Sequence, residues 1–166
     1  MISKKLAAKI NEQIAKELES SYLYLAMSCN CAARSLLGFS AWLRKQSEEE
    51  YEHAMKFLKY LEDQQAAVEL EALRKPPFKF ESVQKIFDGV LAHERGVTKS
   101  INEIYKLAKS EDDFASQAFL DWFVTEQIEE EASAALIVDK LAMIGASAGS
   151  LLYLDKELGK RAREIA

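Results

Sequence analysis

The chain has 166 residues, 49% of them hydrophobic, and a formal net charge of −5. This length suits a single domain over residues 1–166, and the apolar content is enough for a sizeable core. The acidic balance, with no basic run, argues against nucleic acid as a partner and leaves cations, metal ions included, as acceptable ligands. No apolar run approaches membrane-spanning length, so we expect a cytoplasmic protein with no membrane partner.

Residues that interrupt helices are scarce. The chain has only six Gly and two Pro, and Ala, Leu, Glu and Lys are abundant. This composition predicts an all-α fold of long helices. Cys29 and Cys31 are two residues apart, which on a helix turns their side chains to different faces. We therefore expect two reduced thiols rather than a disulfide or a shared metal site.

The first helix is expected over about residues 3–33. Its inward stripe is mostly apolar but also carries Glu17 and Tyr24, which share a face about two turns apart. A short break around residues 35–38 should then allow a second helix to return antiparallel to the first.

The second helix contains the run Glu48-Glu49-Glu50-Tyr51-Glu52-His53. Helical periodicity predicts an inward stripe of Phe39, Leu43, Gln46, Glu50, His53, Phe57 and Leu61. Because an unpaired buried carboxylate is costly, Glu50 and His53 must be paired, hydrogen-bonded or bound to a cation. For this pair alone, the alternative is that the stripe is displaced by one residue and both groups lie on a solvated edge.

Helical patterning lapses over about residues 66–81, where Pro76 and Pro77 cannot occupy a helix interior. Sixteen extended residues reach roughly 50 Å, whereas a helix of about 28 residues is roughly 42 Å long. The segment can therefore travel the length of the bundle. This predicts a four-helix bundle with one long crossover, from the second helix to the third.

The third helix, about residues 82–109, has an apolar inward stripe on which Glu94 is the only charged residue. The acidic segment 110–113 offers a cap for the fourth helix, which should run to about residue 144. Gln127 and Glu130 fall in the middle of the inward stripe of that helix.

A short final helix is expected over about residues 150–164, beyond a bundle that occupies about residues 3–144. Its leucines are Leu151, Leu152, Leu154 and Leu158. The four-helix core offers them no obvious place, which indicates burial between subunits. The alternative is a helix folded back over the end of the bundle.

The polar residues on the four stripes are expected to meet at one depth. Counting about 1.5 Å per residue from each turn places the polar groups of the two hairpins within about 10 Å of one level. So many buried polar groups need counter-charge. Several carboxylates with one imidazole suit hard or borderline divalent ions, and a carboxylate from each hairpin can bridge two such ions, as in di-iron bundles.

With this arrangement the chain resembles the ferritins, and among them the non-haem bacterial ferritins, over essentially its whole length. The residues that match the ferritin ferroxidase centre in order and spacing are Glu17, Tyr24, Glu50, His53, Glu94 and Gln127. The resemblance implies one iron site formed by Glu17, Glu50 and His53. It implies a second site at which Glu50 bridges to Glu94 and Glu130, with Gln127 close enough to orient a ligand.

The resemblance also implies a third iron position. Its ligands would be Glu49, Glu126 and Glu129, with Glu130 shared between this position and the second site. Taken without the resemblance, these three residues are typical of a solvated acidic face.

As a ferritin, the chain would assemble into a hollow shell of 24 subunits. Each subunit would hold two iron ions at the ferroxidase centre, Fe(II) would be oxidised by dioxygen or peroxide, and ferric mineral would be stored inside. The fifth helix would then line the four-fold axes. The alternatives are a ferritin-like di-metal oxidase without core storage and a non-catalytic interaction bundle.

Some features depart from related families. Bacterioferritins carry a second Glu-x-x-His on the fourth helix and a haem-binding Met beside the first, whereas this chain has Gln127-x-x-Glu130 and Tyr51. We therefore expect no haem. Tyr24 is either an electron donor during oxygen reduction or a core tyrosine hydrogen-bonded to a carboxylate. His93 lies about 100° around the helix from its neighbour Glu94, so we expect it to face solvent or another helix.

Overall fold

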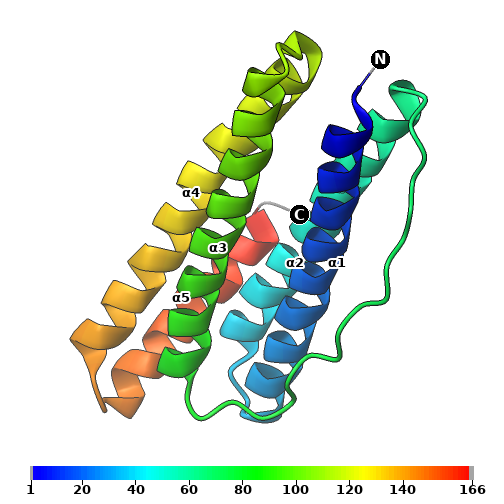
Figure 1. Ribbon diagram of the computed structural model, residues 1–166. Coiled ribbons are helices and arrows are strands. Elements are labelled where there is room, and N and C mark those ends of the chain that lie inside the picture. The colour runs from blue at the N-terminus through cyan, green and yellow to red at the C-terminus, as the bar shows by residue number, and fades with distance from the viewer. Residues whose placement is uncertain (1, 165–166) are drawn as a thin grey trace.

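The computed structural model describes residues 2–164, and the side chains of residues 2–160. Over this part the chain has five helices and no strand: α1 (Lys4–Ala33), α2 (Leu37–Asp63), α3 (Val83–Ser110), α4 (Phe114–Ile144) and α5 (Ala148–Glu164). Figure 1 shows α1 to α4 side by side, with α5 beside one end. The predicted all-α bundle, with its long crossover and short fifth helix, is confirmed. None of the helices, as far as they are described, is long and apolar enough to span a membrane.

Polar side chains cap the starts of three helices. Each accepts a hydrogen bond from the backbone N–H three residues later: Ser3 from Leu6 at 3.0 Å, Ser82 from Lys85 at 3.1 Å and Asp113 from Ser116 at 2.9 Å. These bonds satisfy donors that the first turn of a helix leaves without a partner. The predicted cap in the acidic segment before α4 is thus Asp113.

The core consists of two apolar clusters, separated along the bundle by a polar layer. One cluster surrounds Phe39 and Phe87, and the other surrounds Phe57 and Phe123. The whole inward stripe predicted on α2 is buried, and so are Glu94 on α3 and Gln127 and Glu130 on α4. Burial of each large apolar side chain stabilises the fold by about 1.5–3 kcal/mol. The two clusters can therefore offset the free-energy cost of burying the polar layer between them.

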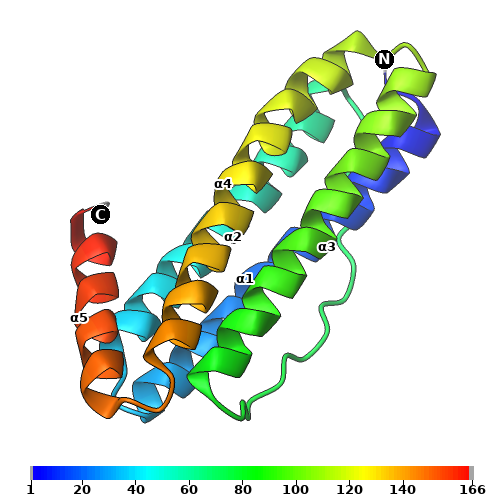
Figure 2. The same ribbon diagram turned by 90° about the vertical axis from the view of Figure 1, so that its left-hand side faces the viewer.

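The connection between α2 and α3 runs the length of the bundle, as Figures 1 and 2 show. Hydrogen bonds and an ion pair hold this connection against α1. The Asn11 amide donates to the Ala67 carbonyl at 3.0 Å and accepts from the Glu69 N–H at 2.9 Å. Further along, the Arg74 guanidinium pairs with the Glu19 carboxylate at 2.6 Å. With this crossover α3 runs parallel to α2, which the alignment of the polar groups requires.

Helix α5 packs against α2 within the same chain. Leu154 and Leu158 are buried in the apolar cluster around Phe39, whereas Leu152 is 59% exposed. The end of the bundle therefore does accept part of the apolar face of α5, which is the alternative interpretation of this helix. Leu152 remains on the outside.

The close contact between α2 and α5 depends on Gly38. The sequence places this glycine in the break before the second helix, but the structure places it in the first turn of α2. A Cβ added at Gly38 would lie 1.6 Å from the Asp155 carbonyl oxygen. The Asp155 carboxylate also accepts a hydrogen bond from the Phe39 N–H at 2.9 Å. Gly38 is therefore explained by helix packing and not by a turn.

Gly38→Ala should displace α5 from α2, because the new methyl group overlaps the Asp155 backbone. Overpacking of this kind costs about 1–3 kcal/mol, so the midpoint of thermal unfolding should fall. Gly96→Ala is the matched control, because a Cβ at this helical position meets nothing within 4 Å. The control should gain about 0.5–1 kcal/mol from the higher helix propensity of alanine. Equal unfolding midpoints for the two variants would contradict this role of Gly38.

Candidate metal centre

The polar residues predicted on the four inward stripes lie together in the layer between the two apolar clusters. All are buried in the structure: Glu17, Glu50, His53, Glu94, Gln127 and Glu130. Four helices contribute to this layer, Glu17 from α1, Glu50 and His53 from α2, Glu94 from α3, and the last two residues from α4. The displaced-stripe alternative for Glu50 and His53 is therefore wrong.

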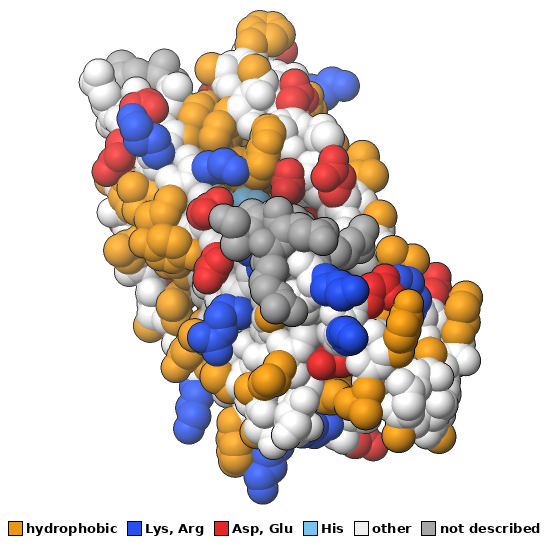
Figure 3. All heavy atoms as spheres, turned by 180° about the vertical axis from the view of Figure 1, so that it is seen from behind, with side chains coloured by type: hydrophobic (Ala, Val, Ile, Leu, Met, Phe, Trp, Pro, Cys, Tyr) orange, Lys and Arg blue, Asp and Glu red, His pale blue; other side chains and the backbone are white. Residues whose placement is uncertain are grey.

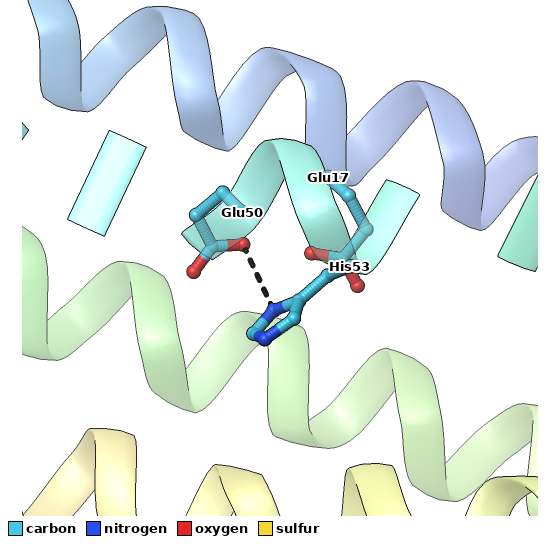
Figure 4. A group of neighbouring side chains, drawn as sticks. All are labelled: Glu17, Glu50 and His53. Atoms are coloured by element: carbon cyan, nitrogen blue, oxygen red, sulfur yellow. Dashed lines mark ion pairs between the residues drawn. The ribbon is translucent and has the colours of Figure 1, made fainter. Parts of the chain in front are cut away.

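The most compact part of this layer consists of Glu17, Glu50 and His53. One ligand atom from each of these side chains lies within 4.8 Å of the other two. Glu50 and His53 are one helical turn apart on α2, and their Oε2 and Nδ1 atoms are 3.8 Å apart. Figure 4 shows the Glu17 side chain reaching toward this pair from α1. Among the described side chains, no other group of three His, Cys, Asp or Glu residues has this geometry.

Three carboxylate oxygens in this group have no hydrogen-bond donor among the described residues. They are Glu17 Oε2, Glu50 Oε1 and Glu50 Oε2. A buried charged oxygen without a partner costs more than an ordinary buried polar group, so such atoms are rare in native proteins. Two carboxylates and an imidazole are oxygen and nitrogen ligands that a divalent first-row metal ion accepts. A bound cation would satisfy all three orphaned oxygens.

The surroundings favour the protonated forms of these acids when no metal is bound. Burial raises the pKa of Glu17 well above its usual range, and the nearby Glu50 charge adds to the shift. The pKa of Glu50 is also well raised, first by burial and then by the charge of Glu94. Burial, together with Glu94, raises the pKa of Glu130 to about 8. Ionising all of these groups together therefore requires a positive charge among them.

Glu94 is held by side chains from two other helices. The Tyr24 hydroxyl of α1 donates to Glu94 Oε1. Gln127 Nε2 of α4 lies 3.2 Å from Glu94 Oε2 and donates to it. Tyr24 is thus a buried tyrosine that hydrogen-bonds to a carboxylate, as one of the two interpretations expects. Neither Glu94 nor Glu130 belongs to the compact group around His53.

The three residues expected at a third iron position lie toward the surface. Glu49 is half-buried, and its carboxylate is 3.8 Å from Lys45 Nζ. Glu126 is half-buried and Glu129 is exposed. The structure does not gather these side chains as it gathers Glu17, Glu50 and His53. The charges of Glu49 and Glu126 do, however, contribute to the raised pKa of Glu130.

The sequence does not predict the contacts of two amide side chains near the centre. Gln13 Nε2 donates to Glu17 Oε1 at 2.8 Å, and Gln46 Nε2 donates to Glu130 Oε2 at 2.7 Å. Gln13 precedes Glu17 by four residues on α1, a spacing at which helical side chains meet. That spacing is the signal that could have identified Gln13. Gln46 reaches Glu130 across the bundle, so no local spacing reveals the contact.

Aromatic and imidazole side chains border the site. The Trp122 ring contacts the His53 ring edge to face, with centroids 5.4 Å apart, and Lys56 Nζ lies 3.4 Å from the Trp122 ring centroid. The Trp122 ring therefore packs directly against the His53 imidazole, and Lys56 packs on Trp122. His93 Nε2 lies 2.7 Å from Ser20 Oγ on α1, so His93 contacts a neighbouring helix, as expected.

Comparison with known proteins identifies the family. Residues 7–144 match the sequence model of the ferritin family, described as a ferritin-like domain. The bacterial non-heme ferritin of Bacteroides fragilis (strain 638R) is 40% identical over 161 residues, which cover 97% of this chain and 100% of that protein. The bacterial non-heme ferritin of Campylobacter jejuni is 38% identical over 156 residues, 94% of this chain and 93% of that protein.

The comparison with solved structures agrees. The open pore ferritin of the hyperthermophilic archaeon Archaeoglobus fulgidus superposes with a TM-score of 0.95 at 45% sequence identity, covering 96% of this chain and 98% of that one. The family match spans most of the chain, and the relatives align over nearly their full length. The chain therefore belongs to the ferritin family, with bacterial non-heme ferritins among its relatives.

Proposed function

We propose that this chain is an iron-storage ferritin that oxidises Fe(II) at the metal centre between its four helices. The observation that carries the proposal is the buried group of Glu17, Glu50 and His53, in which three carboxylate oxygens have no donor. Iron is here the substrate and the stored cargo. The function carried by the relatives' names, bacterial non-heme ferritin, agrees with this chemistry.

Two Fe(II) ions would bind in each subunit. Glu17, Glu50 and His53 would hold the first, and Glu94 and Glu130 would hold the second. Glu50 suits a bridging role because neither of its oxygens has a donor, and because its pKa responds to the charge of Glu94. Each ion gives up one electron to dioxygen or peroxide. The carboxylates stabilise the higher charge of Fe(III), since hard anionic oxygens suit the more highly charged ion.

Gln127 and Tyr24 would orient Glu94 rather than bind iron strongly themselves. Both donate hydrogen bonds to the Glu94 carboxylate, one to each oxygen. Such outer contacts fix the direction of a ligand's lone pairs and its basicity. Tyr24, which hydrogen-bonds to Glu94, would also supply an electron while oxygen is reduced. Glu49, Glu126 and Glu129 would take a third iron ion, together with Glu130.

The oxidised iron would be stored as ferric mineral inside a shell of 24 subunits, in the cytoplasm. The relatives support assembly, because one solved structure is described as an open pore ferritin. The single chain also leaves large apolar side chains exposed, among them Ile128, Met143 and Tyr153. Figure 3 shows apolar side chains gathered in several patches on one face. Exposed apolar patches are typical of surfaces that pack against another chain.

Aerobic mixing of the metal-free protein with a few equivalents of Fe(II) per subunit tests the proposal. Ferric absorbance should rise much faster than in buffer alone, and size-exclusion chromatography should show a particle far larger than a dimer. A rate equal to that of buffer would refute iron oxidation. Rapid oxidation by a monomer or dimer that forms no iron core would identify a ferritin-like di-metal oxidase. Absence of both metal binding and oxidation would leave a non-catalytic interaction bundle.

A further inference from the structure

A chain of hydrogen bonds connects the surface of the bundle to Glu17. Lys16 Nζ donates to Ser100 Oγ at 2.7 Å, and Ser100 Oγ donates to Gln13 Oε1 at 2.6 Å. Gln13 Nε2 then donates to Glu17 Oε1 at 2.8 Å. Lys16, Gln13 and Glu17 belong to α1 and Ser100 to α3, so the chain also joins the two hairpins of the bundle.

The direction of these bonds follows from the donors and acceptors present. A lysine ammonium can only donate, so Ser100 accepts from Lys16 and its single hydroxyl hydrogen is free for Gln13. That hydrogen selects the oxygen of the Gln13 carboxamide, which leaves the NH₂ group facing Glu17. Lys16 and Ser100 together therefore determine the orientation of the Gln13 amide.

The last bond distinguishes the two oxygens of Glu17. Glu17 Oε1 accepts from Gln13, whereas Glu17 Oε2 has no donor. Gln13 is fully buried and Ser100 is only 8% exposed, so water does not compete strongly for the polar atoms between them. Hydrogen bonds to charged groups are stronger than neutral ones, and burial strengthens them further. The Gln13 hydrogen bond thus fixes the orientation of the Glu17 carboxylate and leaves Oε2 as the oxygen without a donor.

We propose that Gln13 is a positioning residue that orients the Glu17 carboxylate so that Oε2 faces the metal. Ser100 fixes the orientation of the Gln13 amide, and Lys16 fixes Ser100. The inference rests on the proposed function of the centre and adds to it the means by which one ligand is aimed. It predicts that substitutions along this series of hydrogen bonds weaken metal binding, most strongly at Gln13 and least at the exposed Lys16. If only the charge of Lys16 influenced metal binding, the Lys16 substitution would weaken it most and the Gln13 substitution least.

Co(II) titration of the assembled, metal-free protein tests this role, because the visible absorption of bound Co(II) reports its coordination. Gln13→Met keeps the length of the side chain but removes the donor to Glu17. Loss of an outer partner of a metal ligand typically weakens metal binding by about 10-fold to 100-fold, and we expect a loss of that size with an altered Co(II) spectrum. Ser100→Ala, a smaller change, should give a weaker loss, and Lys16→Met the least.

Asn11→Met is the matched control. Asn11 is also a buried amide on α1, but its two hydrogen bonds go to the connection between α2 and α3. This variant should lose stability without losing Co(II) affinity. Equal Co(II) affinities and spectra for Gln13→Met and Asn11→Met would overturn the inference.

A second measurement separates positioning from general destabilisation of the bundle. In a Glu17→Ala background, Gln13→Met should cause no further loss of the residual Co(II) binding, because the carboxylate that it positions is gone. A further loss of the same size in that background would overturn the inference. If the unmutated protein binds no Co(II), the proposed function fails together with the inference. If the unmutated protein binds and Gln13→Met binds equally well, only the inference fails.

Discussion

Glu50→Gln is expected to slow the oxidation of Fe(II) by about 100-fold or more. Glu50 is fully buried, has no hydrogen-bond donor on either oxygen, and is the carboxylate assigned to both iron ions. A neutral amide cannot replace a bridging anion. Ligands of this kind contribute several kcal/mol of charge stabilisation, and each 1.4 kcal/mol or so corresponds to about tenfold in rate.

The measurement is the initial rate of ferric absorbance after Fe(II) is mixed aerobically with each protein at two ions per subunit. Glu52→Gln is the control, because Glu52 is exposed on the same helix and the substitution changes net charge equally. The control should oxidise iron at the unmutated rate. A Glu50→Gln protein that keeps half of that rate would show that Glu50 does not bridge the ions.

The second large effect concerns the stability of the metal-free protein as pH changes. The pKa of Glu130 is raised from an ordinary value of 4.5 to about 8, chiefly by burial and then by the charges of Glu94 and Glu49. The folded protein therefore holds a proton that the unfolded chain releases. The stabilisation from this proton is fully present below about pH 4.5 and is lost as pH rises through about 8. At one pKa unit per 1.4 kcal/mol or so, the loss amounts to several kcal/mol at most.

Glu130→Gln should remove this dependence, because an amide does not titrate. With a chelator present, the free energy of unfolding by urea should favour the variant increasingly as pH rises from 5 to 8. Added Co(II) should reverse the order, because the metal-bound carboxylate stabilises the unmutated protein and the amide does not. Glu48→Gln, an exposed carboxylate with no part in the centre, should follow the unmutated curve at a constant offset. Parallel curves for Glu130→Gln and the unmutated protein would contradict the raised pKa.

The bundle and the depth of the polar layer follow from local rules. Apolar side chains recur with the helical period on all four long helices, so Glu50, His53 and Glu94 could be placed on inward faces from the sequence. Counting residues from the turns then placed them at one level. The two prolines mark a non-helical connection that is long enough to span the bundle, which predicts that the second and third helices run parallel. Each of these inferences uses spacing along one segment of the chain.

Contacts between distant segments could not be predicted in this way. Gly38 is indistinguishable from a turn glycine until α5 is known to pass against it. Ser100 and Gln13 are 87 residues apart, and both are uncharged, so the sequence does not indicate that they pair. The distance between Glu49 and the other surface carboxylates depends on side-chain directions that helical spacing does not determine. The outer contacts of the centre therefore required the three-dimensional structure.

Anomalous diffraction from crystals soaked with Fe(II) locates iron without assuming its ligands, so it shows whether iron binds between the four helices. We expect two anomalous peaks inside each bundle. One should lie about 2.0–2.3 Å, a usual metal–ligand distance, from atoms of Glu17, Glu50 and His53, and the other between Glu50, Glu94 and Glu130. Iron found only on the outer surface, with none among these buried side chains, would contradict this expectation.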